Sequence, residues 1–309
     1  MKNMRIPLII ALGVAIIGII LGSFLDLNIS SAIASSTNGL GLTLSAIGPM
    51  IGFAGVAAMG GGFIAFIIKG KYHIVLKIIF GVLAAGCFGV ALKYPAGEWF
   101  GINGFYGAAP EWVGYLIVLV PEAAAGVGGY FLFKDIKNKN MWIVFCIIIG
   151  LLTIALLGVI PALKGFMHRP RFRTISQYTD IAFHNWWEPC KDYKDLMATY
   201  GIESDNFKSY PSGHTAEASI LLMPIVFLPL ADDKFKKYQM PLFYFGCGLI
   251  VVVAFARILA AAHFLSDVST GATVMITLLL IANEVVMRIK ALQPNQEEVK
   301  EESKEEVKE

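Results

Sequence analysis

Three short segments of the sequence carry residues that can bind or transfer a charged group. The first, residues 164–173, holds one lysine, one histidine and three arginines, and the second, residues 211–215, reads Pro-Ser-Gly-His-Thr. The third contains Arg257, His263 and Asp267. Arginine and lysine bind phosphate oxygens, while a neutral imidazole acts as a nucleophile or carries a proton. Together these residue types indicate chemistry on an anionic group such as a phosphate.

The third segment pairs a histidine with an acidic residue. His263 and Asp267 are four residues apart, so on a helix they share one face, and the carboxylate can fix the tautomer of the imidazole. The other ring nitrogen is then free to attack. Arg257 is about 240° away from His263 on a straight helix, so the two converge only if the chain turns between them. Taken alone, the pattern also fits a histidine at the membrane interface with a chance acidic neighbour.

The second segment has the features of a helix N-terminus. Ser212 is a favourable N-cap residue, which is a purely structural role. The functional interpretation adds that Gly213 lets the backbone N–H groups approach an anion closely, and that His214 can donate a proton beside it. The first segment is open to two interpretations as well, because basic residues can form a collar at the end of a membrane helix.

The elements that must position these residues are membrane helices. Of the 309 residues, 56% are hydrophobic and 16% are charged, whereas soluble domains usually carry about 25% charged residues. The net charge of +2 is too small to indicate a nucleic-acid-binding protein. We therefore expect an all-α, polytopic transmembrane bundle of about eight spans. The spans are predicted near residues 6–25, 47–68, 74–93, 113–134, 141–163, 214–231, 241–259 and 268–288. The segment 113–134 contains a proline and several glycines, and its alternative is a re-entrant or interfacial segment.

Charge in the loops predicts the orientation of the bundle. Lysine and arginine collect in every second loop, as they do on the cytoplasmic side of membranes. Both termini are therefore predicted to be cytoplasmic in the plasma membrane, and all three segments extracytoplasmic. The loop 164–213 is basic although it lies on the outer side by this count, and phosphate binding explains its charge.

In order and spacing, the three segments resemble the signature of the type 2 phosphatidic acid phosphatase (PAP2) superfamily. That signature runs Lys-x6-Arg-Pro, then Pro-Ser-Gly-His, then Ser-Arg-x5-His-x3-Asp. Lys164 and Arg171 match the first motif, residues 211–214 match the second, and residues 257–267 match the third.

Two positions depart from the signature: Phe172 stands in place of the proline, and Ala256 stands in place of the serine. Because Arg169 precedes Pro170, the register of the first motif is open, and the family spacing favours Arg171. The missing serine hydroxyl removes one possible hydrogen bond to the phosphate, worth about 1.5–3 kcal/mol.

The resemblance implies a metal-independent membrane phosphatase that acts on a lipid phosphate or diphosphate. Undecaprenyl diphosphate, phosphatidic acid and phosphatidylglycerophosphate are the expected substrates, and no cofactor is expected. The implied roles are nucleophile for His263, proton donor for His214, orientation of the nucleophile for Asp267, and phosphate binding for Lys164, Arg171, Ser212, Gly213 and Arg257. A lipid phosphotransferase with the same phosphohistidine and a non-enzymatic lipid transporter are the alternatives. No Cys/His cluster in the sequence has metal-ligand spacing.

The chain is expected to divide into three regions. Residues 1–140 form an N-terminal region of about four spans, and residues 141–290 a catalytic region of about four spans with the outer loop 164–213. Residues 291–309 are predicted to be an acidic, disordered cytoplasmic tail. The resemblance implies a six-helix catalytic core with three spans before the first motif, whereas five are counted here, which indicates two added N-terminal helices. The long aromatic loop 173–210 either caps the site or forms an interfacial belt.

Overall fold

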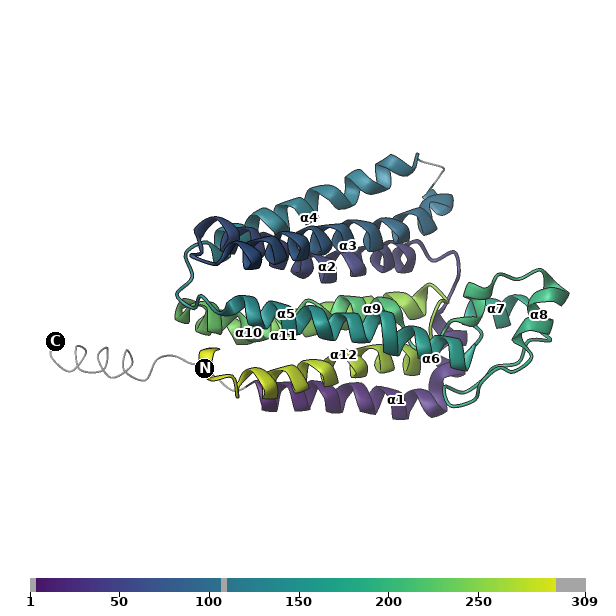
Figure 1. The fold of residues 1–309 in the computed structure, drawn as a ribbon. Coiled ribbons are helices and arrows are strands. Elements are labelled where there is room, and N and C mark those ends of the chain that lie inside the picture. Colours follow the sequence, from purple (N-terminus) through teal and green to yellow (C-terminus); the bar gives the residue numbers. More distant parts are fainter. Residues whose placement is uncertain (1–3, 107–109, 293–309) are drawn as a thin grey trace.

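The computed structural model describes residues 4–106 and 110–292, and every regular element in these ranges is a helix (Figure 1). Eight helical segments are long and apolar enough to cross a membrane, which confirms the predicted fold class. The predicted tail lies outside the described residues from residue 293 onward. The segment 113–134 forms one of the eight helices and is not re-entrant.

The eight spans follow one another along the chain, and two of them are each built from consecutive helices. The first four are α1 (Arg5–Ile33), α2 (Gly39–Lys69), α3 (Ile74–Tyr106) and α4 (Glu111–Phe133). The fifth comprises α5 (Met141–Thr153), a π-helical stretch (Ile154–Val159) and α6 (Ile160–Met167). The sixth comprises α9 (Gly213–Ser219) and α10 (Leu222–Ala231), and the last two are α11 (Lys236–Leu259) and α12 (Leu265–Val286).

Helix α1 extends well beyond its predicted end near residue 25. Residues 26–31 include Asp26, Asn28 and two serines, which a hydropathy pattern assigns to a loop. In the structure Asp26 is 2% exposed and faces the bundle, so the helix continues through this polar stretch. Helix α1 is therefore longer than predicted because Asp26 is buried with a partner and does not lie in a loop.

Small residues let α1 pack closely along α12. A β-carbon on Gly22 would lie 2.6 Å from the backbone nitrogen of Ser266, and one on Gly18 would collide with the side chain of Ser269. Glycines four residues apart on one face are a common device for close approach of membrane helices. The same face continues to Asp26, which therefore points at the beginning of α12.

Helices α3 and α4 form the periphery of the bundle. They pack mainly on α2 and on each other, and Figure 1 shows them on the far side of α2 from α5, α11 and α12. Helices α1 and α2, in contrast, contact α11 and α12 or α9 directly. Helices α3 and α4 are therefore the peripheral pair, whereas α1 and α2 pack on helices that carry the second and third motif segments.

The long loop after α6 folds into a cap at one end of the bundle. This cap, residues 172–210, contains α7 (Phe172–Gln177), α8 (Tyr193–Tyr200) and a 3-10 turn (Ser204–Phe207). It has its own buried cluster of Ile181, Cys190, Ile202 and Phe207. Figure 1 shows the cap at the end of the bundle opposite the beginning of α1 and the end of α12.

Aromatic side chains fix the cap to the bundle. Trp186 donates its indole N–H to Ser23 of α1 at 2.9 Å and stacks on Tyr210, and the ring of Phe183 packs against Phe264. Of the two tryptophans, Trp187 is the more open, with 48% of its surface exposed. These contacts favour a cap over an interfacial belt for Phe183 and Trp186.

Candidate active site

His263 lies in the short connection between α11 and α12 and is 1% exposed. Its Nδ1 is 2.6 Å from the carbonyl oxygen of Ser209 and 3.7 Å from Oδ2 of Asp267. Because a carbonyl oxygen only accepts, Nδ1 must carry the proton, and Nε2 keeps its lone pair. The sequence analysis left open which nitrogen carries the proton and expected Asp267 as its acceptor, but 3.7 Å is too long for a hydrogen bond, and Ser209 takes that place.

Asp267 is linked to His263 indirectly, through Ser209. Its Oδ2 accepts from the hydroxyl of Ser209 at 2.5 Å and from the backbone N–H of Phe264 at 2.8 Å. It therefore holds both the residue that binds His263 and the first turn of α12, where it closes a capping interaction. Its negative charge also lies close enough to stabilise a cationic imidazole.

Burial and neighbouring cations keep His263 neutral. Desolvation lowers the pKa of this histidine well below its usual value; Asp267 opposes this shift, and the positive charges of Arg171, Arg257 and Lys164 lower the pKa further. A neutral imidazole with a free Nε2 is the form that can attack an electrophile. The cations that would bind an anion thus also prepare the nucleophile.

A tight turn brings Arg257 and His263 together, as the sequence requires. The carbonyl oxygen of Arg257 accepts the backbone N–H groups of Ala262 and His263, each at 3.2 Å. Ala261, inside the turn, has a φ of +54°, a left-handed conformation that costs a non-glycine residue about 1–2 kcal/mol. Ala261 is 2% exposed, so the residues packed around it hold the strained turn.

The other two cations reach the same place from α6 and from the start of the cap. Nζ of Lys164 donates to the carbonyl oxygen of Lys208 at 3.1 Å and lies 4.0 Å from where a β-carbon on Gly213 would be. Arg171 donates through Nη1 to the carbonyl oxygen of Ala262 at 3.3 Å, next to His263. Lys164, Arg171, Gly213 and His263 therefore form one cluster.

An acidic residue of the cap balances this cluster. Asp205 pairs with Arg171 at 3.0 Å and with Arg173 at 3.1 Å. Burial alone would raise the pKa of Asp205, but Arg171, Arg173 and Lys164 together hold it below its ordinary value. The sequence analysis did not identify Asp205, because 34 residues separate it from Arg171 and no motif contains it.

Ser212 and His214 open the sixth span beside this cluster. Ser212 caps α9 by accepting the backbone N–H of Thr215 at 3.4 Å, so its structural role is present. Its own N–H donates to the carbonyl oxygen of Asp267 at 2.9 Å, which ties the second motif to the third. His214 follows in the first turn of α9 and is buried.

Arg169 and Arg171, the two candidates for the first-motif arginine, have different surroundings. Arg169 is fully buried, and its guanidinium donates to Asp26 at 2.9 Å, to Asp267 at 2.6 Å and to Ser266 at 2.8 Å. These bonds commit it to the interior of the bundle. Arg171 lies on the side of His263, so the geometry supports Arg171 as the phosphate ligand.

The sequence analysis missed the role of Asp26. This residue joins α1 to the beginning of α12 through Arg169 and through the backbone N–H of Ser266, at 2.9 Å. One signal was available: Gly18, Gly22 and Asp26 recur every fourth residue and so lie on one helix face. The hydropathy pattern did not reveal this recurrence, because Asp26 lies where the apolar run ends.

An apolar groove of about 610 Å³ opens beside the site between α1, α11 and α12. Aliphatic and aromatic side chains line it, including Ile10, Val14, Phe243 and Ile250. At the cap end it reaches Leu265, two residues after His263. The groove is therefore a candidate site for a hydrocarbon chain.

Metal-ligand side chains gather elsewhere. Among the described residues, one group of three, His184, Cys190 and Asp192, lies close together, and it belongs to the cap. It shares no residue with the predicted catalytic and phosphate-binding set.

Comparison with known proteins supports the sequence resemblance. A family model described as the PAP2 superfamily matches residues 124–290, more than half of the chain. The matched range begins within α4 and contains all three motif segments. Searches of curated proteins and of solved structures gave no match.

Proposed function

Because the chain belongs to the PAP2 superfamily, we propose that it is an integral membrane phosphatase acting on a lipid phosphate or diphosphate through a phosphohistidine. One observation carries the proposal: a buried His263, whose Nδ1 faces the carbonyl oxygen of Ser209, lies among Lys164, Arg171 and Arg257, and burial lowers its pKa so that the neutral form is favoured. Such a set binds a phosphate and presents a nucleophile to it.

In the first step, the lone pair on Nε2 of His263 attacks the terminal phosphorus as the bond from that phosphorus to the oxygen of the leaving group breaks; the leaving group is the lipid alcohol of a monophosphate or the lipid monophosphate of a diphosphate. His214 donates a proton to that departing oxygen. Lys164, Arg171 and Arg257, with the N–H groups at Ser212 and Gly213, hold the phosphoryl oxygens and stabilise their charge. The positive charge that develops on the imidazole is stabilised by the carbonyl oxygen of Ser209 and by Asp267.

In the second step, His214 takes a proton from a water molecule, which attacks phosphorus. The bond from nitrogen to phosphorus breaks, phosphate leaves, and His263 returns to its neutral form. Each step uses only groups of this chain, the lipid phosphate and water.

The apolar groove supports a lipid as the substrate. A hydrocarbon chain in the groove would lie between α1, α11 and α12 with its polar end toward Leu265 and His263. Undecaprenyl diphosphate, phosphatidic acid and phosphatidylglycerophosphate all combine such a chain with a terminal phosphate. We place the site on the extracytoplasmic side of the plasma membrane, because the basic loops predicted to be cytoplasmic lie at the other end of the spans.

The test is release of phosphate by the purified, detergent-solubilised protein without added divalent metal. We expect release from at least one of the three lipids, with inhibition by vanadate, and a loss of at least about 10³-fold in kcat for His263→Ala. His73→Ala, an exposed histidine after α2, is the matched control and should be unaffected.

Two outcomes would favour the other functions. Transfer of phosphate to an added lipid or sugar faster than its release would indicate a phosphotransferase. Equal activity of His263→Ala and the unaltered protein, or no phosphate release from any lipid phosphate, would contradict the proposed function.

A further inference from the structure

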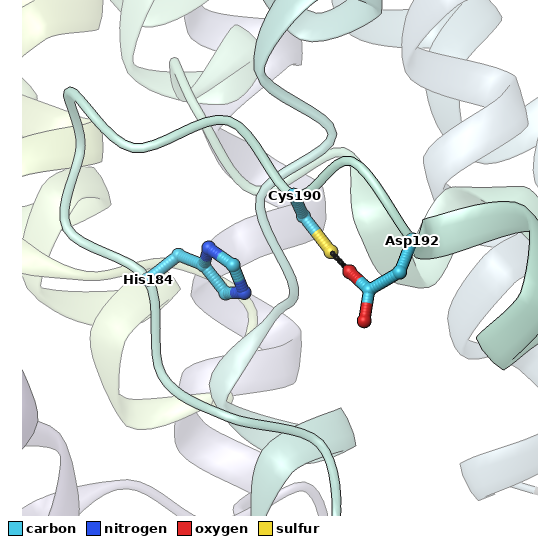
Figure 2. A group of neighbouring side chains, drawn as sticks. All are labelled: His184, Cys190 and Asp192. Atoms are coloured by element: carbon cyan, nitrogen blue, oxygen red, sulfur yellow. Dashed lines mark hydrogen bonds between the residues drawn. The ribbon is translucent and has the colours of Figure 1, made fainter.

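Three side chains of the cap lie around a common space, away from the catalytic residues. His184 and Cys190 belong to the loop between α7 and α8, and Asp192 immediately precedes α8. Figure 2 shows the imidazole of His184 pointing toward the thiol of Cys190 and the carboxylate of Asp192. One ligand atom from each side chain lies within 4.8 Å of the other two. Sγ of Cys190 is 3.3 Å from Oδ1 of Asp192.

These separations are close to those of a tetrahedral metal site. With bond lengths of about 2.0–2.3 Å to zinc, neighbouring ligand atoms lie about 3.3–3.6 Å apart. The thiol and the carboxylate already have this separation, and the nearest nitrogen of His184 lies within 4.8 Å of both ligand atoms. Imidazole, thiolate and carboxylate are ligands that Zn²⁺ accepts together, and water can complete the set.

The backbone holds the ligand-bearing loop in place. The carbonyl oxygen of His184 accepts from Nε of Arg169 at 2.8 Å, and the N–H of Cys190 donates to the carbonyl oxygen of Met167 at 2.9 Å. Between them, Glu188 accepts the N–H of Asn185 through its carboxylate at 2.9 Å. A loop fixed at two of its three ligand positions needs little ordering when a metal binds.

Burial of the cluster differs from one side to the other. Cys190 is 1% exposed and packs with Ile181, Ile202 and Phe207, whereas Asp192 is exposed. An ion would therefore enter from solvent beside the carboxylate of Asp192 and reach the thiol of Cys190 in the buried part of the cluster. A disulfide does not compete within the chain, because the other three cysteines lie in α3, α5 and α11.

We propose that His184, Cys190 and Asp192 bind one divalent transition-metal ion of the Zn²⁺ class. The ion would stabilise the cap and take no part in phosphoryl transfer. It closes the loop whose carbonyl group, at His184, holds Arg169 in its contact with Asp267. The site would thus fix the cap on the bundle.

The test uses the full-length protein in detergent, without an affinity tag and stripped of metal by a chelator. Titration with Co²⁺ should give one equivalent of binding, with the d–d absorption of a tetrahedral ion and a thiolate-to-cobalt charge-transfer band. Zn²⁺ should displace the Co²⁺ and abolish both signals. The readout does not depend on enzymatic activity.

Variants identify the ligands. Cys190→Ser should lose the charge-transfer band, while Cys247→Ser, which removes a thiol from α11, should keep it. Asp192→Asn changes an exposed side chain, so folding is preserved, and it should weaken Co²⁺ binding at least about tenfold. Absence of the band in the unaltered protein, its persistence in Cys190→Ser, or unchanged affinity in Asp192→Asn would overturn the proposal.

Discussion

Arg169 is fully buried and links α1 to the beginning of α12 beside the candidate site. Its guanidinium joins two carboxylates, Asp26 and Asp267, and stacks over Phe264 with 4.3 Å between the guanidinium carbon and the ring centroid. A buried charge is tolerated when every donor has a partner, and removal of one partner leaves the others uncompensated. The orientation of Asp267 is therefore set partly from α1.

Replacement of Asp26 by asparagine tests this dependence. Asp26→Asn should destabilise the protein by about 3–5 kcal/mol, because it breaks a fully buried ion pair. In the fraction that folds, kcat should fall at least about tenfold with KM little changed, since no phosphate ligand is altered. Asn28→Ala, an exposed neighbour on α1, is the control for both readouts. A normal kcat in folded Asp26→Asn would show that α1 does not support the site.

The depressed pKa of His263 predicts how the site responds to acid. Neutral imidazole is the nucleophilic form, and a pKa well below the usual value keeps His263 neutral when the pH falls below 6.5. The unfolded chain takes up a proton there at about pH 6.5, so stability should decrease as the pH falls below that value.

Nuclear magnetic resonance of ¹⁵N-histidine-labelled protein separates this histidine from other titrating groups. The signals of His263, assigned by their loss in His263→Gln, should stay those of the Nδ1-protonated neutral ring well below pH 6.5. Titration with a midpoint near 6.5 would contradict both the low pKa and the buried setting.

At the scale of elements, the contact between α1 and α12 decides whether Asp26 can reach its partners. A β-carbon on Gly22 would lie 2.6 Å from the backbone nitrogen of Ser266, whereas one on Gly13 would meet nothing within 4 Å. Both glycines belong to α1, but only Gly22 lies against the backbone of α12.

Gly22→Val should therefore separate the two helices, while Gly13→Val should leave them in place. We expect Gly22→Val to lower the thermal midpoint and to reduce kcat at least about tenfold, since Asp26 moves with α1. Gly13→Val is the matched control. Similar behaviour of the two variants in thermal unfolding and phosphate release would exclude a close α1–α12 contact.

The elements themselves could be predicted from apolar runs of about 20 residues, which fix the number of spans. The end of α1 could not, because hydropathy treats Asp26 as a loop residue and the compensating charge, Arg169, is 143 residues away. The motifs contain Lys164, Arg171 and Arg257, whose positive charges lie near His263. They did not predict Ser209 as the acceptor of Nδ1 or Asp205 as the partner of Arg171, since both contacts depend on how the cap folds.

At the scale of the whole molecule, the beginning of α1 and the end of α12 lie at one end of the bundle and the cap lies at the other (Figure 1), and we expect the cap to be extracytoplasmic. A cysteine introduced at Lys194, on α8, should react with a membrane-impermeant maleimide on intact cells. One introduced at Lys71, between α2 and α3, should react only after the membrane is opened. The unaltered protein gives the background from its four cysteines. The reverse pattern would place the site on the cytoplasmic side.

The bond between Asp26 and the beginning of α12 has a consequence for the order in which the protein is made. Its partners there are 240 residues further along the chain, so α1 enters the membrane long before α12 is synthesised. Arg169 follows Asp26 by 143 residues and Ser266 follows it by 240, so for the first part of that interval Asp26 has neither partner, and for the rest it lacks Ser266. The support for His263 is complete only when the last span has been inserted. We therefore expect a chain whose translation stops before α12 to insert into the membrane but to release no phosphate from lipid phosphates.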